Sequence, residues 1–234
     1  MAVGVWVGLA GGAVAGATPQ EPQPPGHVEV PARTSISVRS VVPGVGWGTA
    51  NETESRGGLS VSKLYMADYA LRHGDGSAED RVLGERMIRY SDDAAADSMA
   101  AKYPRAIDSV AEEYQLSATH GAGEWGMSST STADMADFLA AKLRSDPDSP
   151  ILGWMEHSGK TASDGTVQDW GTARLPRVIG TKWGWADTGE PEVASASYGQ
   201  GFTVAAHTYG TSGEQTEDVL GALSGVITEW LPKR

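Results

Sequence analysis

The alternation of apolar and polar positions predicts strands at the start of the chain and a helix after them. Apolar residues alternate with polar ones over residues 34–42, which is typical of a half-buried strand. The turn residues Pro43 and Gly44 then lead into a second short strand over residues 45–47, so the two form a hairpin. After a polar loop, helical spacing extends over residues 59–71.

Helices are predicted in the middle of the chain and strands near its end. Ser77 is a good N-cap for a helix over residues 78–90, and an alanine-rich helix over residues 94–101 follows. Ser212-x-x-Gln215 is a capping box that opens an amphipathic C-terminal helix. Three strand-like runs precede that helix, at 177–185, 192–198 and 201–208.

Composition limits the classes of protein that this chain can belong to. With 234 residues, of which 40% are hydrophobic, it is long enough for one sizeable domain or for two lobes that share an interface. The formal net charge of -12 argues against nucleic-acid binding, which needs a basic face. The absence of cysteine excludes disulfides, thiolate metal sites and a cysteine nucleophile. The five histidines have no paired spacing, so neither a metal site nor a cofactor is predicted.

The first 33 residues are typical of an export segment followed by a tether. Residues 1–17 are apolar, rich in glycine and alanine, and end in small-residue triplets, as signal peptides do. No lysine or arginine precedes this run, and it is shorter than the roughly 20 residues of a membrane span. We expect a signal peptide or the remnant of a membrane anchor, then a proline-rich linker over residues 18–33, and location in the cell envelope or outside the cell. A buried N-terminal element is the alternative.

Ser60 and Lys63 form the pattern S-x-x-K at the start of the first predicted helix. Residues three apart share one face of a helix, so the lysine amine can lie beside the serine hydroxyl. A neutral amine there can accept the proton as the hydroxyl attacks a carbonyl, which requires a lowered lysine pKa. The pattern is typical of serine acyl-transfer enzymes, although so short a pattern also arises by chance.

Two further short motifs follow in the chain. Ser91, Asp92 and Asp93 lie between two predicted helices, where a hydroxyl and short acidic side chains also serve as ordinary caps. The run from Lys182 to Gly184 lies on a strand-like segment, where a lysine is usually a solvated residue at the sheet edge. Each motif alone is weak evidence for a function. Their occurrence in this order along the chain makes the evidence from all three stronger.

The three motifs, on these element types, resemble the serine β-lactamase and penicillin-binding protein superfamily, whose motifs are S-x-x-K, S-D-N and K-T-G. The resemblance is closest to the class A-like branch and spans roughly residues 34–231. It implies an α+β fold of the β-lactamase/transpeptidase type, with an antiparallel sheet flanked by helices plus an all-helical lobe. The domain would extend over 34–234, with an αβ lobe at 34–75 and 172–234 and a helical lobe at 76–171.

The resemblance implies four catalytic residues. Ser60 would be the nucleophile that forms an acyl-enzyme, and Lys63 would activate it directly or through water. Ser91 would relay a proton to the leaving nitrogen. Lys182 would hold Ser91 and the substrate carboxylate by charge. The oxyanion hole would combine the backbone N–H of Ser60 with one from the strand after Lys182.

The implied substrate-binding residues are Asp93, Trp183, Gly184, Trp185 and Glu124, and two of them depart from the family pattern. Asp93 stands where the family has asparagine, so a group that donates and accepts is replaced by a carboxylate that only accepts. Trp183 replaces the threonine or serine of K-T-G, which removes a hydroxyl and is expected to add bulk at the mouth of the site. Trp185 or Ala186 would supply the second N–H of the oxyanion hole.

The segment between Leu116 and Ser129 is the third departure, because it is short where the class A-like branch has its Ω-loop. The glutamate-x-x-leucine-asparagine pattern of a deacylating enzyme cannot be completed, since Asn51 is the only asparagine. Glu124 is the candidate base, and Glu113 is the less favoured one. Without a placed base, deacylation is expected to be slow.

Three functions remain open from the sequence. The first is a serine acyl-enzyme with slow deacylation, acting on a β-lactam or a cell-envelope peptide. The second is a catalytically inactive binding protein of the cell envelope. The third is an unrelated serine hydrolase, although residues 58–62 lack the closing glycine of a G-x-S-x-G elbow. We expect a monomer with a small-molecule or peptide substrate and no nucleic-acid partner.

Overall fold

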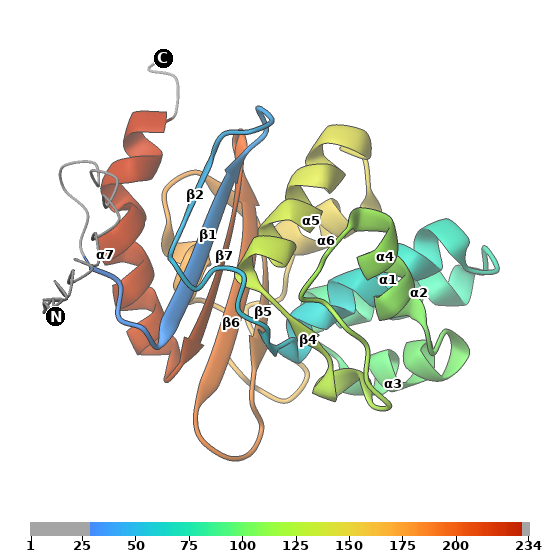
Figure 1. Ribbon diagram of the computed structural model, residues 1–234. Helices are drawn as coiled ribbons and strands as arrows, with labels where there is room; N and C mark the ends of the chain where they lie inside the picture. The colour runs from blue at the N-terminus through green and yellow to red at the C-terminus, as the bar shows by residue number, and fades with distance from the viewer. Residues whose placement is uncertain (1–28, 231–234) are drawn as a thin grey trace, which may run out of the picture.

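The computed structural model describes residues 29–230, with side chains up to residue 225. The predicted export segment, 1–17, and most of the predicted linker lie outside these residues. A five-stranded antiparallel sheet divides the described part, with α7 on one face and the remaining α-helices on the other side (Figure 1). The predicted α+β fold, an antiparallel sheet flanked by helices with a helical lobe, is confirmed.

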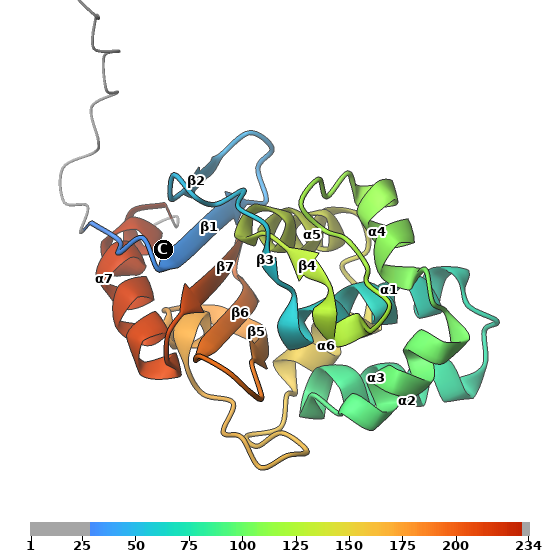
Figure 2. The ribbon, with the colours of Figure 1, turned by 60° about the horizontal axis from the view of Figure 1, so that its bottom comes forward.

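The sheet brings the two ends of the described chain together. Its strand order is β2-β1-β7-β6-β5, so the first strand pairs with the last and β5 is an open edge. A short separate pair, β3 and β4, lies between the sheet and the helical side (Figure 2). The strands are β1 (Thr34–Ser40), β2 (Gly46–Gly48), β3 (Arg56–Gly57), β4 (Ser129–Thr130), β5 (Val178–Trp185), β6 (Glu192–Gly199) and β7 (Phe202–Tyr209).

Most of the segment between β3 and β5 is helical, and the helices predicted over residues 78–90 and 94–101 are found there. The α-helices are α1 (Lys63–His73), α2 (Ala78–Tyr90), α3 (Asp93–Lys102), α4 (Ala106–Tyr114), α5 (Thr132–Ser145), α6 (Pro150–Glu156) and α7 (Ser212–Trp230). Three short 3-10 helices are η1 (Leu59–Ser62), η2 (Trp125–Met127) and η3 (Gly171–Arg174). Although α5 lies within the range predicted as the helical lobe, it packs on β1 and β7 and so also covers the sheet.

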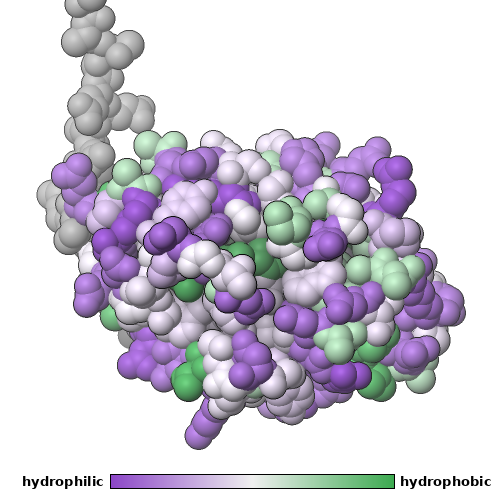
Figure 3. Space-filling model, turned by 90° about the horizontal axis from the view of Figure 1, so that it is seen from below, coloured by the Kyte–Doolittle hydropathy of each residue, from purple (hydrophilic) through white to green (hydrophobic). Residues whose placement is uncertain are grey.

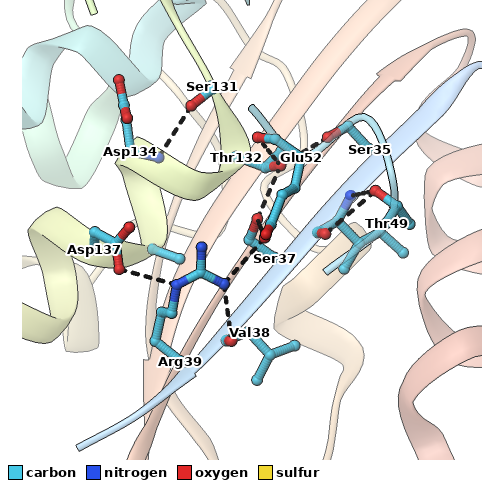
Figure 4. A network of polar contacts seen from close by, with 12 residues as sticks. Ser35, Ser37, Val38, Arg39, Thr49, Glu52, Ser131, Thr132, Asp134 and Asp137 are labelled. Carbon is cyan, nitrogen blue, oxygen red and sulfur yellow. Dashed lines mark hydrogen bonds and ion pairs between the residues drawn. The ribbon is translucent and has the colours of Figure 1, made fainter. Parts of the chain in front are cut away.

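β1 is buried on both faces, which differs from the half-buried strand that its alternation predicted. Ile36 and Val38 belong to the apolar core shared with α7. The hydroxyls of Ser35 and Ser37 lie under α5, 2.7 and 3.2 Å from Thr132 Oγ1 (Figure 4). Buried polar groups with partners are tolerated. The polar positions of this strand therefore mark a buried hydrogen-bonded contact.

α1 is the central helix of the larger apolar core. Its Tyr65 packs edge to face on Phe138 of α5, with ring centroids 5.1 Å apart. Asp68, fully buried, accepts a hydrogen bond from the Lys142 ammonium at 2.8 Å. Because an unpaired buried charge is costly, this pair strongly favours one placement of α1 against α5.

The C-terminal helix begins with a different capping box from the one predicted. Thr211 and Glu214 cap each other: Thr211 N donates to Glu214 Oε2 at 2.8 Å, and Glu214 N donates to Thr211 Oγ1 at 3.3 Å. The predicted partner Gln215 is instead fully buried, where it donates to Val193 O and accepts from Ser195 Oγ. Both spacings fit the capping pattern, and packing against β6 decides between them.

No helix within residues 29–230 is both long enough and apolar enough to cross a membrane. The prediction of a signal peptide or anchor concerns residues 1–17, which lie outside this range.

Candidate active site

Ser60 lies in the tight turn that leads into α1. The preceding residue, Leu59, has φ 47°, a left-handed conformation that costs energy for a residue with a side chain. Ser60 is only 8% exposed and lines a cleft. Its Oγ accepts a hydrogen bond from Lys63 Nζ at 2.8 Å. The three-residue spacing therefore places the two groups in contact, as expected from the sequence.

Lys63 is fully buried and surrounded by acceptors. Its Nζ donates to Ser60 Oγ, to Ser91 O at 2.8 Å and to Asp93 Oδ1 at 2.5 Å. The Trp125 ring centroid lies 4.5 Å from the same atom. Burial lowers the pKa of Lys63, and the Asp93 carboxylate opposes that shift.

Ser91 is held in the turn between α2 and α3. It adopts a left-handed conformation with φ 53° as the C-cap of α2. The next residue, Asp92, caps α3 by accepting from Ala95 N at 3.1 Å and pairs with Arg86 at 2.7 Å. These local contacts hold Ser91 at the end of the cleft. The helix-capping and functional interpretations of this motif are therefore compatible.

Lys182 reaches Ser91 from the edge strand β5. Its Nζ donates to Ser91 Oγ at 2.8 Å and to the backbone oxygen of Trp183 at 2.8 Å. Lys182 is fully buried. Burial, and secondly the nearby Lys63 charge, lower the pKa of Lys182 well below its ordinary value.

β5 approaches the turn that carries Ser60 because residue 184 is glycine. A Cβ at Gly184 would lie 2.8 Å from Ser60 N and 2.8 Å from Leu59 Cβ, closer than packed atoms allow. Gly184 thus permits the contact between the strand and the start of α1. The absence of a side chain at residue 184 lets the two backbones lie in contact.

A cleft of about 690 Å³ opens over Ser60 and Ser91. It lies on the side seen in Figure 3, where hydrophilic residues occupy much of the surface. One wall comes from the loop before β4, a second from the start of α3, and a third from the end of β5 and the turn after it. The side chains used below lie in its lining: Asp92, Asp93, Glu124, Trp125, Ser163, Asp164, Trp185, Asp187 and Glu192.

The structure brings together the four residues predicted as catalytic. The Ser60–Lys63 and Lys182–Ser91 hydrogen bonds are each 2.8 Å, and Lys63 links the two pairs through the backbone oxygen of Ser91. Among the predicted substrate-binding residues, Asp93 contacts Lys63 directly. Glu124 and Trp185 are cleft-lining residues as well.

The expectation that Trp183 adds bulk at the mouth of the site is wrong. Its side chain is buried with Trp170 and Val193, and its Nε1 donates to Trp170 O at 2.9 Å. Successive strand residues point to opposite faces, so this indole points away from the side that Lys182 occupies. Trp185 reaches the cleft at the end of the strand, where its Nε1 donates to Asp164 at 3.1 Å.

Two contacts of the site were not predicted from the sequence. Trp125 covers Lys63, and its Nε1 donates to Asp97 Oδ1 of α3 at 2.7 Å. Asp187, in the turn after β5, is exposed in the cleft, and its charge is near enough to raise the pKa of Lys63. A tryptophan in a short glycine-rich loop was the available signal for the first, whereas nothing local distinguishes Asp187 from any turn residue.

Within the described residues, no group of three or more histidine, aspartate or glutamate side chains is arranged to hold a metal ion. The site combines the hydroxyls of Ser60 and Ser91 with the amines of Lys63 and Lys182, whose pKa values are lowered by burial.

No family model and no curated protein matches the sequence. Solved structures do match: a variant of the last common ancestor of Gram-negative class A β-lactamases has a TM-score of 0.63 at 17% identity, covering 86% of this chain and 94% of that chain. D-alanyl-D-alanine carboxypeptidase from Mycobacterium tuberculosis has a TM-score of 0.62 at 17% identity, covering 91% and 98%. Penicillin-binding protein D2 from Listeria monocytogenes, in its cefotaxime-bound form, has a TM-score of 0.61 at 17% identity, covering 84% and 96%.

Each of these matches covers nearly the whole of the compared domain, and their identities are too low to transfer an activity. They share one architecture with this chain. The chain has the fold of the serine β-lactamase and penicillin-binding protein superfamily, as the order of its three motifs predicted.

Proposed function

We propose that the protein is a serine hydrolase or acyltransferase of the penicillin-recognising type, which forms an acyl-enzyme at Ser60. The observation that carries the proposal is the hydrogen-bonded set of Ser60, Lys63, Ser91 and Lys182 at the end of an open cleft. Three sequence-distant segments supply these groups. A hydroxyl in contact with a buried amine is what nucleophilic catalysis requires.

The proposed reaction needs no group beyond the chain and its substrate. Neutral Lys63 accepts the proton of Ser60 as Oγ attacks the carbonyl carbon. The bond from that carbon to the leaving nitrogen or oxygen then breaks. Ser91 donates its proton to the leaving atom, and Lys182 or Lys63 restores the proton of Ser91. Burial lowers the pKa of both amines, and Lys63 is the one suited to act first as base because its Nζ contacts Ser60 Oγ.

The oxyanion of the intermediate is proposed to bind two backbone N–H groups, those of Ser60 and Trp185. Ala186 N donates to Glu192 O of the neighbouring strand at 2.9 Å. Because N–H groups alternate direction along an antiparallel strand, the N–H of Trp185 points to the open edge of β5. That edge is where Gly184 meets Ser60.

Slow deacylation is part of the proposal. Trp125 covers Lys63 at 4.5 Å, and Glu124 beside it is exposed on the cleft wall. An indole cannot serve as general base and excludes water from the face that it covers. The acyl group would therefore remain on Ser60 or pass to an acceptor other than water.

A catalytically inactive binding protein is the second candidate function. It is favoured by the 2.5 Å contact between Lys63 and Asp93, because an ion pair stabilises the protonated amine that cannot act as a base. In this case the same cleft would bind its ligand without a covalent step.

Covalent labelling tests the proposal. The protein is incubated with a fluorescent penicillin and, separately, with an uncharged fluorophosphonate, and adducts are measured by intact-mass spectrometry. We expect an adduct that is lost in Ser60→Ala and kept in the matched control Ser163→Ala, since Ser163 lines the same cleft outside the hydrogen-bonded set. An adduct that persists in Ser60→Ala contradicts the assignment of the nucleophile, and no adduct with either probe favours the binding protein.

We further propose that the domain over residues 34–234 is a monomer that acts outside the cytoplasm on a small molecule or a peptide, with lobes at 34–75 plus 172–234 and at 76–171. The apolar first 17 residues support export. The size of the cleft supports a substrate of this class.

A further inference from the structure

Neither lysine of the site is free to bind a substrate carboxylate. Lys63 and Lys182 are both fully buried, and both are absent from the residues that line the cleft. The Lys63 amine is already paired with Asp93, while the Lys182 amine is directed to Ser91 and to a backbone oxygen. The hydroxyl that K-T-G would add is missing, because residue 183 is a tryptophan whose side chain packs elsewhere.

The lining of the cleft carries carboxylates from every wall and no lysine, arginine or histidine. Some of these carboxylates have partners outside the cleft. Asp92 forms an ion pair with Arg86 at 2.7 Å, and Glu192 Oε1 lies 3.0 Å from His207 Nε2. Asp164 accepts hydrogen bonds from Thr166 and from the Trp185 indole. These hydrogen bonds lower the pKa of Asp164 and keep its carboxylate ionised.

Two carboxylates at the mouth of the cleft have no such partner. Within the described residues, the side chains of Glu124 and Asp187 form no ion pair, and both are exposed. They come from different walls, one from the loop before β4 and the other from the turn after β5. The Trp185 ring lies on the same wall as Asp187 and adds an aromatic surface, which attracts cations.

We propose that this cleft selects acyl donors that carry a cationic group, such as a substituted ammonium, beside the reactive carbonyl and rejects donors that carry a carboxylate there. The inference rests on the proposed function, because it names the substrate class of the same site. It goes beyond that function because it predicts that the preferred substrate carries no free carboxylate beside the reactive carbonyl. A cleft lined by one sign of charge concentrates ligands of the opposite sign and repels those of the same sign.

Three thioesters with one acyl skeleton test the proposal on the full chain. Their acyl chains end in a trimethylammonium group, in the isosteric tert-butyl group or in a carboxylate, and acylation of Ser60 is followed by intact-mass spectrometry. We expect the cationic donor to react about tenfold faster than the neutral one at low salt, and the anionic donor at least tenfold slower. The difference should shrink as ionic strength rises, because exposed charges are screened.

Variants assign the preference to its residues. In the double variant Glu124→Gln with Asp187→Asn, the ratio of the cationic to the neutral rate should fall at least threefold. The matched control is Glu190→Gln, an exposed carboxylate of the same turn that does not line the cleft, and it should leave the ratio unchanged. Equal rates for the three donors, or a faster anionic donor, overturn the inference.

Binding to Ser60→Ala separates this inference from the proposed function. The unreactive amides that correspond to the cationic and anionic thioesters are titrated into this variant by calorimetry. Tighter binding of the cationic amide supports the charge preference even if no thioester acylates the protein, an outcome that contradicts only the acyl-enzyme. Acylation without a charge preference contradicts only the present inference. If the protein shows no acylation and no tighter binding of the cationic amide, both the inference and the proposed function are contradicted.

Discussion

At the scale of single residues, the Lys63 amine is the group whose protonation decides the chemistry. Burial favours its neutral form, while Asp93 at 2.5 Å favours its charged form. The family's asparagine would remove the charge of Asp93 and leave burial opposed only by the smaller effects of Asp92 and Asp187. Trp125 adds a further influence, since its ring covers the amine at 4.5 Å.

Replacing Asp93 by asparagine tests which influence dominates. Asp93→Asn removes the charge that raises the pKa of Lys63, so the pKa falls further below its ordinary value. Because Lys63 acts as a base when neutral, the acid limb of the acylation pH profile should move to lower pH. The profile is measured by intact mass with the fluorophosphonate. The control is Glu79→Gln in the first turn of α2, at the opposite end of that helix from Ser91. A limb that stays in place or moves to higher pH contradicts this role of Asp93.

Removing the Trp125 indole tests its role in the lifetime of the acyl-enzyme. Trp125→Ala should speed the loss of the acyl group about tenfold, which corresponds to about 1.4 kcal/mol of barrier, because water gains access to Lys63. Trp125→Phe keeps an aromatic ring but loses the hydrogen bond to Asp97. Its rate of acyl loss should lie between those of the unmodified protein and Trp125→Ala. The decay of isolated acyl-enzyme is followed by mass, and an unchanged half-life in Trp125→Ala would count against the shielding role.

At the scale of elements, the site is assembled by contacts between segments that are far apart in sequence. The turn before α1 supplies Ser60, the turn between α2 and α3 supplies Ser91, and β5 supplies Lys182. β5 and the start of α1 meet where Gly184 leaves room for the backbone of Ser60. The close approach of these two elements therefore depends on the absence of a side chain at residue 184.

Adding a methyl group at this contact should damage activity more than stability. In Gly184→Ala, the new Cβ would lie 2.8 Å from Ser60 N, so β5 or the turn must shift, at a cost of about 1–3 kcal/mol. We expect acylation of the folded protein to fall at least tenfold. Unfolding in urea and the acylation rate are measured together. The control is Gly153→Ala in α6, where a Cβ meets nothing within 4 Å. Equal acylation in both variants contradicts the role of Gly184 in allowing β5 to contact Ser60.

At the scale of the whole molecule, charge and packing act on the same scaffold. The chain has a net charge of -12, and its stability depends on carboxylates that are paired in the folded state. On the helical side, Arg72 connects α1 to Glu113 of α4 and to the buried Asp68. Hydrogen bonding from Arg72 lowers the pKa of Glu113 to about 2.

Acid should therefore weaken the fold in a defined range. A carboxylate whose pKa is lowered by folding stabilises the protein above its ordinary pKa, which is 4.5 for Glu113, and this stabilisation is lost as the pH falls toward about 2. We expect the free energy of unfolding, measured in urea, to decrease from pH 5 to pH 3. Glu113→Gln should show a smaller decrease across this range, and an equal decrease would contradict the contribution of Glu113.

The sequence predicted the order and type of the main elements because apolar spacing and capping residues act locally. The helix over residues 78–90 and the strand ending at Trp185 lie at the predicted positions, and the hairpin of β1 and β2 forms as expected. The proximity of Ser60 and Lys63 also followed from spacing alone. Choices between equivalent local patterns could not be predicted, as the capping box at Thr211 shows.

The sequence by itself determined which groups with reactive side chains the chain contains, their order, and the contact of one pair within a single helical turn. Tertiary structure alone decided that Lys182 reaches Ser91, that Trp183 points into a buried cluster, and that Trp125 lies over Lys63. The reason is physical: spacing along one element sets which side chains share a face. The burial that lowers a lysine pKa, and the charges that line a cleft, arise only when separate elements pack together.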